Sequence, residues 1–286
     1  MSFWEFEGNE VTIMACSDCN TRCKHCYIGY SGNFDGESLY NLCSLLIRKY
    51  KVTLNGTELL LHPEFFESMR LVGQDFIITN GLELVKKPEL IQELLSIGIK
   101  YVGISYHFFI HDKISSIDPS IVEPLLKNLK QAGIIADIRV TITSENYDRI
   151  EEICDLTYKM GATGIKFTNY LYVGAATKLK KSNVLTDGQL NSFFEQLEKV
   201  RSKYNKEDFL IRRCGSFGNS KNRIFKCPAI TDSVVITPDL KVYPCIFMAR
   251  KGMEIGVVEA GKIRIDSNCQ INNSCCTAKE IFNGSC

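Results

Sequence analysis

The chain has 286 residues and a mass of 32.3 kDa, enough for about two domains at roughly 150 residues per domain. It is 45% hydrophobic and 23% charged, which is ordinary for a folded protein and excludes a disordered chain or a coiled coil as a description of the whole. The 34 basic and 33 acidic residues nearly cancel, so the charge does not favour nucleic acid or a membrane surface as a partner. No apolar run approaches the ~18 residues of a membrane span, and the chain starts without the basic segment of a signal peptide, so we expect a cytoplasmic protein.

A short apolar run followed by a helical pattern recurs along the first two hundred residues. The predicted strands cover residues 11–15, 52–54, 76–79, 101–105, 135–142 and 164–168, and the predicted helices cover 37–50, 63–71, 89–97, 119–132, 147–160 and 186–204. Strands that alternate with helices predict parallel βα units. We therefore expect an α/β fold with a partial (β/α)6 TIM-like barrel, although an open doubly wound sheet fits the same count. Either fold places the chemistry at the carboxyl ends of the strands.

The rhythm of strands and helices stops near residue 212, and cysteines become frequent after it. We place a domain boundary there, with the barrel in residues 1–211 and a small Cys-rich domain in residues 212–286. Within the second domain, residues 234–237 and 241–243 flank Pro238-Asp239, and this pattern predicts a β-hairpin.

Cysteine is the unusual feature of the composition, with 13 in the chain. An odd number fits disulfides poorly, and no export signal points to an oxidising compartment. In a reducing compartment, many cysteines usually indicate metal. They gather in two groups, one near the start of the chain and one in the tail.

The first group, Cys19, Cys23 and Cys26, lies in the loop after the first predicted strand. Three thiolates in a tight loop can ligate three irons of a [4Fe–4S] cluster and leave the fourth iron open, whereas most iron–sulfur sites use four cysteines. Zinc is the alternative, because Cys16 and His25 could complete a set of four ligands.

This segment resembles the radical S-adenosylmethionine (SAM) family, and the resemblance extends over most of the chain. The three cysteines match its CxxxCxxC signature, and Tyr27 matches the aromatic residue that follows it. Residues 55–58, Asn-Gly-Thr-Glu, are similar to the family's GGE motif, with Asn and Thr as departures. The segments 61–65, 104–113 and 167–175 resemble its later motifs in the same order.

The resemblance implies a mechanism and a set of cofactor-binding residues. The open iron would bind the amino and carboxylate groups of SAM, and one electron would cleave its carbon–sulfur bond to give a 5′-deoxyadenosyl radical that abstracts a substrate hydrogen atom. Glu58 would accept the ammonium group. Arg139 is the candidate for the carboxylate because a guanidinium binds a carboxylate through two hydrogen bonds, although it could instead form an ion pair within the barrel. Further residues expected at the cofactor are Tyr27, Asn55, Gly56, Asn80 and Ser105, the last two with the alternative of ordinary strand-end positions.

The cysteines of the tail are similar to the SPASM and twitch domains of that family, which carry auxiliary clusters. Tyr243-Pro244-Cys245 matches well, but Leu240 stands where those domains usually have Gly, and the full SPASM cysteine run is absent. We therefore expect a twitch-like domain with one auxiliary [4Fe–4S] cluster. Its predicted ligands are Cys227, Cys245, Cys269 and Cys275. Cys276 or Cys286 could replace either of the last two, and a structural zinc is the alternative metal.

The substrate is less constrained than the cofactor. The tail and residues 104–113 favour a ribosomally made peptide, modified by epimerisation or cross-linking, and for an epimerisation Cys214 is the candidate hydrogen-atom donor. Only 15 residues precede Cys16, which leaves no room there for a peptide-recognition domain, so either a separate recognition protein or a small-molecule substrate would explain its absence. An electron donor such as flavodoxin or ferredoxin is expected as well. The alternatives are a dehydrogenase or epimerase of an amino sugar or cyclitol and, from another class, an electron-transfer iron–sulfur protein or a zinc-binding module.

Overall fold

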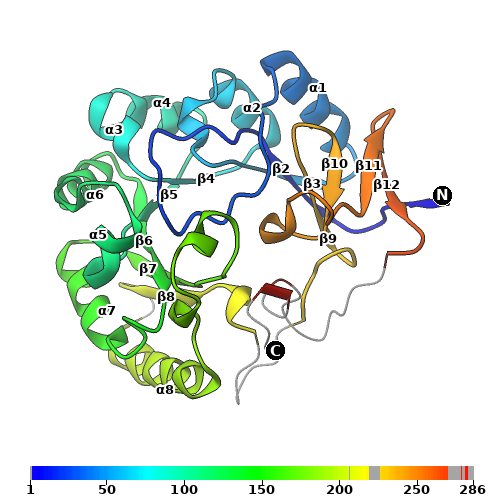
Figure 1. The fold of residues 1–286 in the computed structure, drawn as a ribbon. Helices are drawn as coiled ribbons and strands as arrows, with labels where there is room; N and C mark the ends of the chain where they lie inside the picture. The colour runs from blue at the N-terminus through cyan, green and yellow to red at the C-terminus, as the bar shows by residue number, and fades with distance from the viewer. Residues whose placement is uncertain (1, 206, 219–225, 270–277, 279–280, 283–286) are drawn as a thin grey trace.

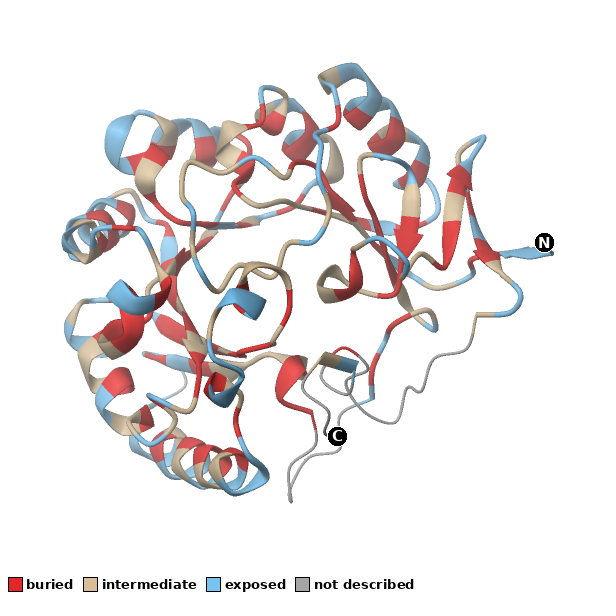
Figure 2. Cartoon of the chain, viewed as in Figure 1, coloured by how far each residue is buried: buried red, intermediate tan, exposed pale blue. Residues whose placement is uncertain are grey.

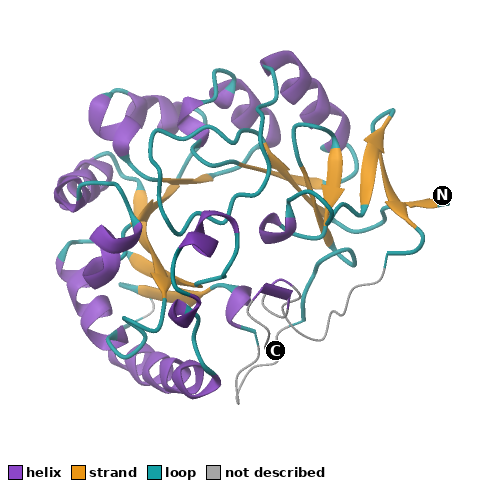
Figure 3. Ribbon diagram, in the orientation of Figure 1, coloured by secondary structure: helices purple, strands orange, loops and turns teal. Residues whose placement is uncertain are grey.

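The computed structural model describes residues 2–205, 207–218, 226–269, 278 and 281–282. Strands form the inside of a curved arrangement and helices cover its outside (Figure 3). The strands are β1 (Phe3–Glu5), β2 (Glu10–Met14), β3 (Lys51–Asn55), β4 (Phe76–Thr79), β5 (Tyr101–Ser105), β6 (Ile135–Ile142), β7 (Gly164–Asn169), β8 (Leu210–Arg213), β9 (Ser233–Ile236), β10 (Lys241–Tyr243), β11 (Gly256–Glu259) and β12 (Lys262–Asp266). The α-helices are α1 (Gly36–Leu46), α2 (Phe65–Val72), α3 (Leu82–Lys86), α4 (Leu90–Ser96), α5 (His111–Ile114), α6 (Val122–Gln131), α7 (Ile150–Lys159) and α8 (Asp187–Lys203).

Two sheets make up the arc. One is five-stranded and wholly parallel, in the order β4-β5-β6-β7-β8. The other is seven-stranded, in the order β1-β12-β11-β10-β9-β2-β3, with β2 parallel to both β3 and β9. The expected partial barrel is therefore confirmed, and all six predicted strands are present. The sequence reading missed β1, β8, β11 and β12.

The side chain of Gln74 fills the gap between the two sheets, where β3 and β4 do not pair. Its amide oxygen accepts a hydrogen bond from the Leu54 N–H (2.7 Å), and its amide nitrogen donates to the carbonyl oxygens of Leu54 (3.1 Å) and Phe76 (2.7 Å). Because buried backbone groups need partners, this one side chain substitutes for part of a missing ladder. The curve of strands thus continues across the break.

The apolar core lies between the strands and the surrounding helices. Figure 2 shows buried residues on the helix faces that turn toward the sheets and exposed residues on the outer faces. In β6, the even positions Ala136, Ile138, Val140 and Ile142 are buried in this core, so the odd positions face the inside of the barrel, which we call the lumen.

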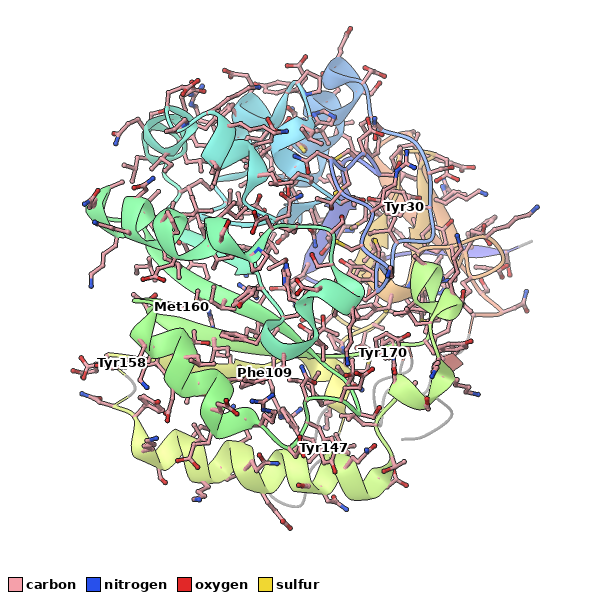
Figure 4. All side chains as sticks on the ribbon, turned by 60° about the vertical axis from the view of Figure 1, so that its left-hand side comes forward. Tyr30, Phe109, Tyr147, Tyr158, Met160 and Tyr170 are labelled. Atoms are coloured by element: carbon pink, nitrogen blue, oxygen red, sulfur yellow. The ribbon has the colours of Figure 1, made fainter. Side chains whose placement is uncertain are left out.

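The end of the barrel that holds the carboxyl ends of the strands can be followed in Figure 4. Tyr170 comes directly after β7 and Tyr147 lies just before α7, whereas Tyr158 and Met160 mark the opposite end of α7. The segment between β2 and α1, drawn in blue in Figure 1, lies inside the ring of helices. The residues of the first cysteine group are therefore brought over the arc of strands.

The predicted hairpin is confirmed as β9 and β10, which pair antiparallel through Val242 with Ile236 and Tyr243 with Val235. It does not stand apart from the barrel, because β9 extends the barrel sheet beside β2. β8 crosses residue 211, where we placed the boundary, and pairs with β7. The domain boundary at residue 211 therefore stays a proposal, because the segments before and after it contribute strands to the same sheet. No helix within the described part of the chain is long and apolar enough to cross a membrane.

Candidate active site at the carboxyl ends of the strands

The loop after β2 carries Cys19, Cys23 and Cys26, and backbone contacts hold it against α5 and the turn that follows. The Lys24 N–H donates to the Ile114 carbonyl (2.8 Å), and the Arg22 N–H donates to the Ser116 hydroxyl (3.1 Å). His25 places its Nδ1 3.0 Å from the same Ile114 oxygen. The loop is therefore fixed on both sides of Cys23.

The three thiols are free and half-buried. Asn80 Nδ2 lies 3.7 Å from the Cys19 sulfur, and the Ser115 hydroxyl lies 3.8 Å from the Cys23 sulfur. The pKa of the Cys26 thiol is raised, first by burial and further by the nearby Cys23 and Cys19. Three neighbouring thiolates repel one another, so this set fits an iron–sulfur cluster, whose irons would offset the charge.

Cys16 is a poor ligand for the zinc alternative, which would then depend on His25, because the structure commits the Cys16 thiol elsewhere. Its sulfur donates to the carbonyl oxygen of Glu58 (3.6 Å), and burial raises its pKa to about 11. A high pKa disfavours the thiolate that binds a metal. Among the residues that the structure describes, no three His, Cys, Asp or Glu side chains converge closely enough to hold a single metal ion.

Glu58 is a buried carboxylate just after β3. Its Oε1 accepts from the Thr79 hydroxyl and its Oε2 from the Asn80 N–H, both at 2.8 Å. Burial raises its pKa to about 7 in spite of these two donors. It is 1% exposed and forms no ion pair within the described part of the chain. A buried carboxylate that lacks a cation fits a ligand ammonium group.

Asn55 and Gly56, which lead to Glu58, shape the backbone. The side chain of Asn55 accepts from the Gly56 N–H (2.9 Å). A Cβ at Gly56 would lie 2.9 Å from the Cys16 sulfur, so only Gly fits there without a shift. These residues position Glu58, and the Asn55 side chain forms no hydrogen bond with a described residue outside this turn.

Asn80 directly follows β4 and Ser105 is the last residue of β5, as expected. Asn80 is nearly saturated: its side chain accepts from the Leu82 N–H (2.9 Å) and donates to Asn20 (2.7 Å), which in turn donates to Glu83 (3.0 Å). It therefore ties the cysteine loop to α3. Ser105 is half-buried in the lumen beside Arg139, its partner in the sheet register.

Arg139 forms the ion pair that we considered as its alternative. Its Nε donates to Asp137 (3.0 Å), and Arg212 from β8 donates to the other oxygen of the same carboxylate (2.7 Å). Burial raises the pKa of Asp137 to about 6, and Arg139 opposes that rise. The sequence reading missed Asp137, Arg212 and their neighbour Lys166. Polar residues at alternate positions of a buried strand were the signal that could have found them.

Tyr27 connects the cysteine loop to the tail. Its backbone oxygen accepts from Arg250 Nη2 (2.8 Å), and its ring meets that of Phe247 edge to face at 4.8 Å. Burial raises its pKa, and Cys26, Cys214 and Cys245 are near enough to add to the effect. Tyr30 similarly packs against β9 and β10 while its hydroxyl donates to the Cys16 carbonyl (2.6 Å; Figure 4).

The cysteines of the tail lie on separate segments. Cys227 is buried before β9, Cys245 follows β10, and Cys269 follows β12, where it packs partly against the core. Cys275, with its alternatives Cys276 and Cys286, lies outside the described residues. Cys214 directly follows β8, and its N–H donates to the Phe167 carbonyl (2.8 Å). The auxiliary ligand set stays a prediction.

No sequence family model matches the chain, and no curated protein matches it. Solved structures do. Streptococcus suis SuiB bound to its precursor peptide SuiA is similar over 99% of this chain and 72% of that one, with 16% identity and a TM-score of 0.69. AnSMEcpe with bound AdoMet is similar over 87% and 77%, with 19% identity and a TM-score of 0.67.

Escherichia coli coproporphyrinogen III oxidase (HemN), described as a radical SAM enzyme, is similar over 70% of this chain and 53% of that one, with 12% identity and a TM-score of 0.50. At this level of identity, a likeness in structure establishes the fold. The chain therefore has the fold of the radical SAM enzymes.

Proposed function

We propose that the chain is a radical SAM enzyme. The observation that carries the proposal is the pairing of two features at one end of the barrel. Three free cysteines lie on an anchored loop, and a buried carboxylate, Glu58, lies beside it without a cation in the described residues. Asn80 joins the two, because its backbone N–H binds Glu58 and its side chain reaches Cys19 and Asn20.

In this proposal Cys19, Cys23 and Cys26 hold a [4Fe–4S] cluster, and Glu58 binds the ammonium group of SAM. When bound, this pair supplies one-electron cleavage of the carbon–sulfur bond of SAM and a 5′-deoxyadenosyl radical that takes a hydrogen atom from the substrate. The protein's part is to orient and to exclude water. Thr79 and the Asn80 N–H hold the Glu58 carboxylate in one orientation, and the buried surroundings strengthen its attraction for a cation.

Tyr27 closes the site on the side of the tail, with Phe247 against its ring and Arg250 on its carbonyl oxygen. These contacts support a second proposal, that the tail carries an auxiliary [4Fe–4S] cluster. Its ligands would be Cys227, Cys245, Cys269 and Cys275. Cys245 belongs to the same small apolar cluster as Tyr27, the residue that follows Cys26.

We further propose that the substrate is a ribosomally made peptide, altered by epimerisation or cross-linking. SuiB bound to its precursor peptide and anSMEcpe bound to the Cp18Cys peptide support this class, since both share the fold of this chain. The reaction would then be that of an oxidoreductase or isomerase. An external electron donor such as flavodoxin or ferredoxin would complete the system.

The test is an anaerobic assay. The full chain is loaded with iron and sulfide, reduced with dithionite and given SAM, and 5′-deoxyadenosine is measured by chromatography. We expect 5′-deoxyadenosine from the wild type and none from the variant in which Cys19, Cys23 and Cys26 are all Ala. Iron binding without any 5′-deoxyadenosine would contradict radical SAM chemistry and favour an electron-transfer protein.

A further inference from the structure

The lumen faces of β5 to β8 carry polar residues where a barrel interior is usually filled with apolar ones. The sheet register aligns Ser105 with Arg139, Arg139 with Lys166, and Lys166 with Arg212. Paired residues in a parallel sheet point to the same face, so three cations on three neighbouring strands lie side by side. We call Arg139, Lys166 and Arg212 the cation row.

Among the described residues, one acidic side chain forms ion pairs with the cation row. Asp137 is fully buried and lies two residues before Arg139 on β6. Arg139 and Arg212 each donate a hydrogen bond to one of its oxygens. Lys166 is near enough to stabilise the Asp137 carboxylate, but it makes no hydrogen bond or ion pair with any described residue. Three positive charges against one negative charge leave a net charge of +2 for this group.

The aromatic ring of Tyr101 supports the row. The guanidinium of Arg212 lies 4.9 Å from the ring centre and that of Arg139 lies 5.9 Å from it. Arg212 Nε is buried and has no hydrogen-bond partner among the described residues. A buried donor without a partner costs free energy unless a ligand satisfies it. The side chain of Arg212 is 36% exposed, so solvent or a ligand can reach the rest of the group.

We propose that the cation row binds an oxyanion of the substrate, a carboxylate or a phosphate. Two guanidinium groups and a free ammonium on one surface match the several acceptor oxygens of such a group. That the bound anion belongs to a substrate rests on the proposed function. The binding of an anion to the row can be measured whether or not that function is correct.

The row holds three cations, more than the single carboxylate of SAM needs. The ammonium and carboxylate of the methionine moiety are attached to one carbon atom, so a residue that binds the carboxylate must lie near Glu58. Along the arc, Lys166 lies on the fourth strand and Arg212 on the fifth strand from β3, the strand that leads to Glu58. Arg139 lies at the end of the row nearer to Glu58, and Lys166 and Arg212 extend it away.

The test measures the binding of inorganic phosphate and of succinate to the iron-loaded full chain by calorimetry, and the tighter probe identifies the type of oxyanion. We expect Lys166→Met to weaken binding at least tenfold, Lys166→Arg to restore it, and Lys159→Met, which removes an exposed cation from the end of α7, to leave it unchanged. Lys166 makes no hydrogen bond or ion pair with any described residue and loses only a longer-range attraction to Asp137, so this variant should keep a melting temperature close to that of the wild type. SAM affinity should also stay the same.

Equal binding of both probes to the wild type and to Lys166→Met would overturn the proposal. A loss of SAM affinity in Lys166→Met without a change in probe binding would also overturn it, since the row would then belong to the cofactor. Formation of 5′-deoxyadenosine is measured in parallel. Its absence would count against the proposed function and would leave the result for anion binding intact.

Discussion

The two groups of cysteines differ in how the fold places them. Cys19, Cys23 and Cys26 lie in one loop, held by the Ile114 carbonyl and the Ser116 hydroxyl at the carboxyl end of the barrel. Cys227, Cys245 and Cys269 lie on three segments separated by the strands β9 to β12. A short loop needs only local contacts to gather its ligands, whereas the tail must first form its strands and pair them with β2. The first group could therefore be predicted from the spacing of its cysteines along the chain. The positions of the cysteines in the second group depend on the pairing of the whole sheet.

The largest expected effect separates the two groups by their iron content. Two [4Fe–4S] clusters correspond to about eight irons per chain. Replacing Cys19, Cys23 and Cys26 together with Ala should leave about four irons and abolish 5′-deoxyadenosine, because the tail ligands are untouched. The iron is measured by a colorimetric assay after anaerobic reconstitution.

The matched variant is Cys245→Ala, which should also lower the iron to about four but keep SAM binding. If the triple variant instead binds no iron, the tail does not hold a cluster of its own.

Cys214 tests whether the tail side of the site takes part in chemistry. If the reaction is an epimerisation, the thiol S–H bond breaks and its hydrogen atom goes to the substrate carbon radical. The sulfur radical that remains regains the thiol with an electron and a proton from the reducing system. Cys214→Ala should then keep 5′-deoxyadenosine formation and lose the epimer, measured by mass spectrometry of the peptide in deuterated water. Continued delivery of solvent deuterium to the reacting carbon would exclude Cys214 as the donor.

Glu58 should govern SAM affinity without affecting either group of cysteines. Glu58→Gln keeps the shape and removes the charge, so the contact with the ammonium should weaken by about 1–3 kcal/mol, roughly 5- to 150-fold in Kd. Calorimetry with SAM measures the change, and the iron content should be that of the wild type. Unchanged affinity would remove Glu58 from the cofactor site.

The pH dependence of stability should be a smaller effect of the same residue. The folded protein keeps Glu58 protonated up to a pKa of about 7, whereas the unfolded chain releases that proton near 4.5. Between these values the folded state binds more protons at Glu58, so the contribution of this carboxyl to stability is greatest below about pH 4.5 and falls as the pH rises toward 7. This carboxyl would contribute a loss of up to about 3 kcal/mol.

Denaturant unfolding of the SAM-free protein at pH 5 and pH 7 tests this contribution. Asp137, with a pKa of about 6, acts in the same direction and is present in both proteins. The quantity to compare is therefore the difference between wild type and Glu58→Gln, which should lose the Glu58 part. Identical pH profiles for the two proteins would show that Glu58 titrates normally.

Much of the barrel could be predicted because its strands are short apolar runs between helical segments. β8 escaped prediction because Leu210–Arg213 contains two arginines and only two apolar residues, and an arginine that faces a polar lumen resembles a surface residue. β1 escaped because all three of its residues are exposed. The parallel pairing of β9 with β2 joins residues more than two hundred positions apart, and no local pattern encodes it.

For the site, the motifs located the loop and Glu58, whose burial and two hydrogen bonds the structure adds. Asp137, two residues before Arg139 on β6, was signalled only by the alternation of polar residues and was not found. Arg212 reaches Asp137 only once β6, β7 and β8 stand side by side. The Gln74 link between the sheets was equally hidden, since a single glutamine between a helix and a strand carries no pattern. Spacing along the chain predicts which residues one loop brings together. Contacts between residues on different strands depend on how the strands pair.

The central claim is that the three-cysteine loop and Glu58 together form a SAM site with one open iron. Electron paramagnetic resonance of the reduced protein tests it most directly, before and after SAM is added, in the variant Cys245→Ala, which isolates the cluster of the loop. We expect SAM to shift the signal of this cluster, and Glu58→Gln in the same background to need more SAM for the same shift. A loop cluster whose spectrum SAM leaves unchanged at any concentration would contradict the account.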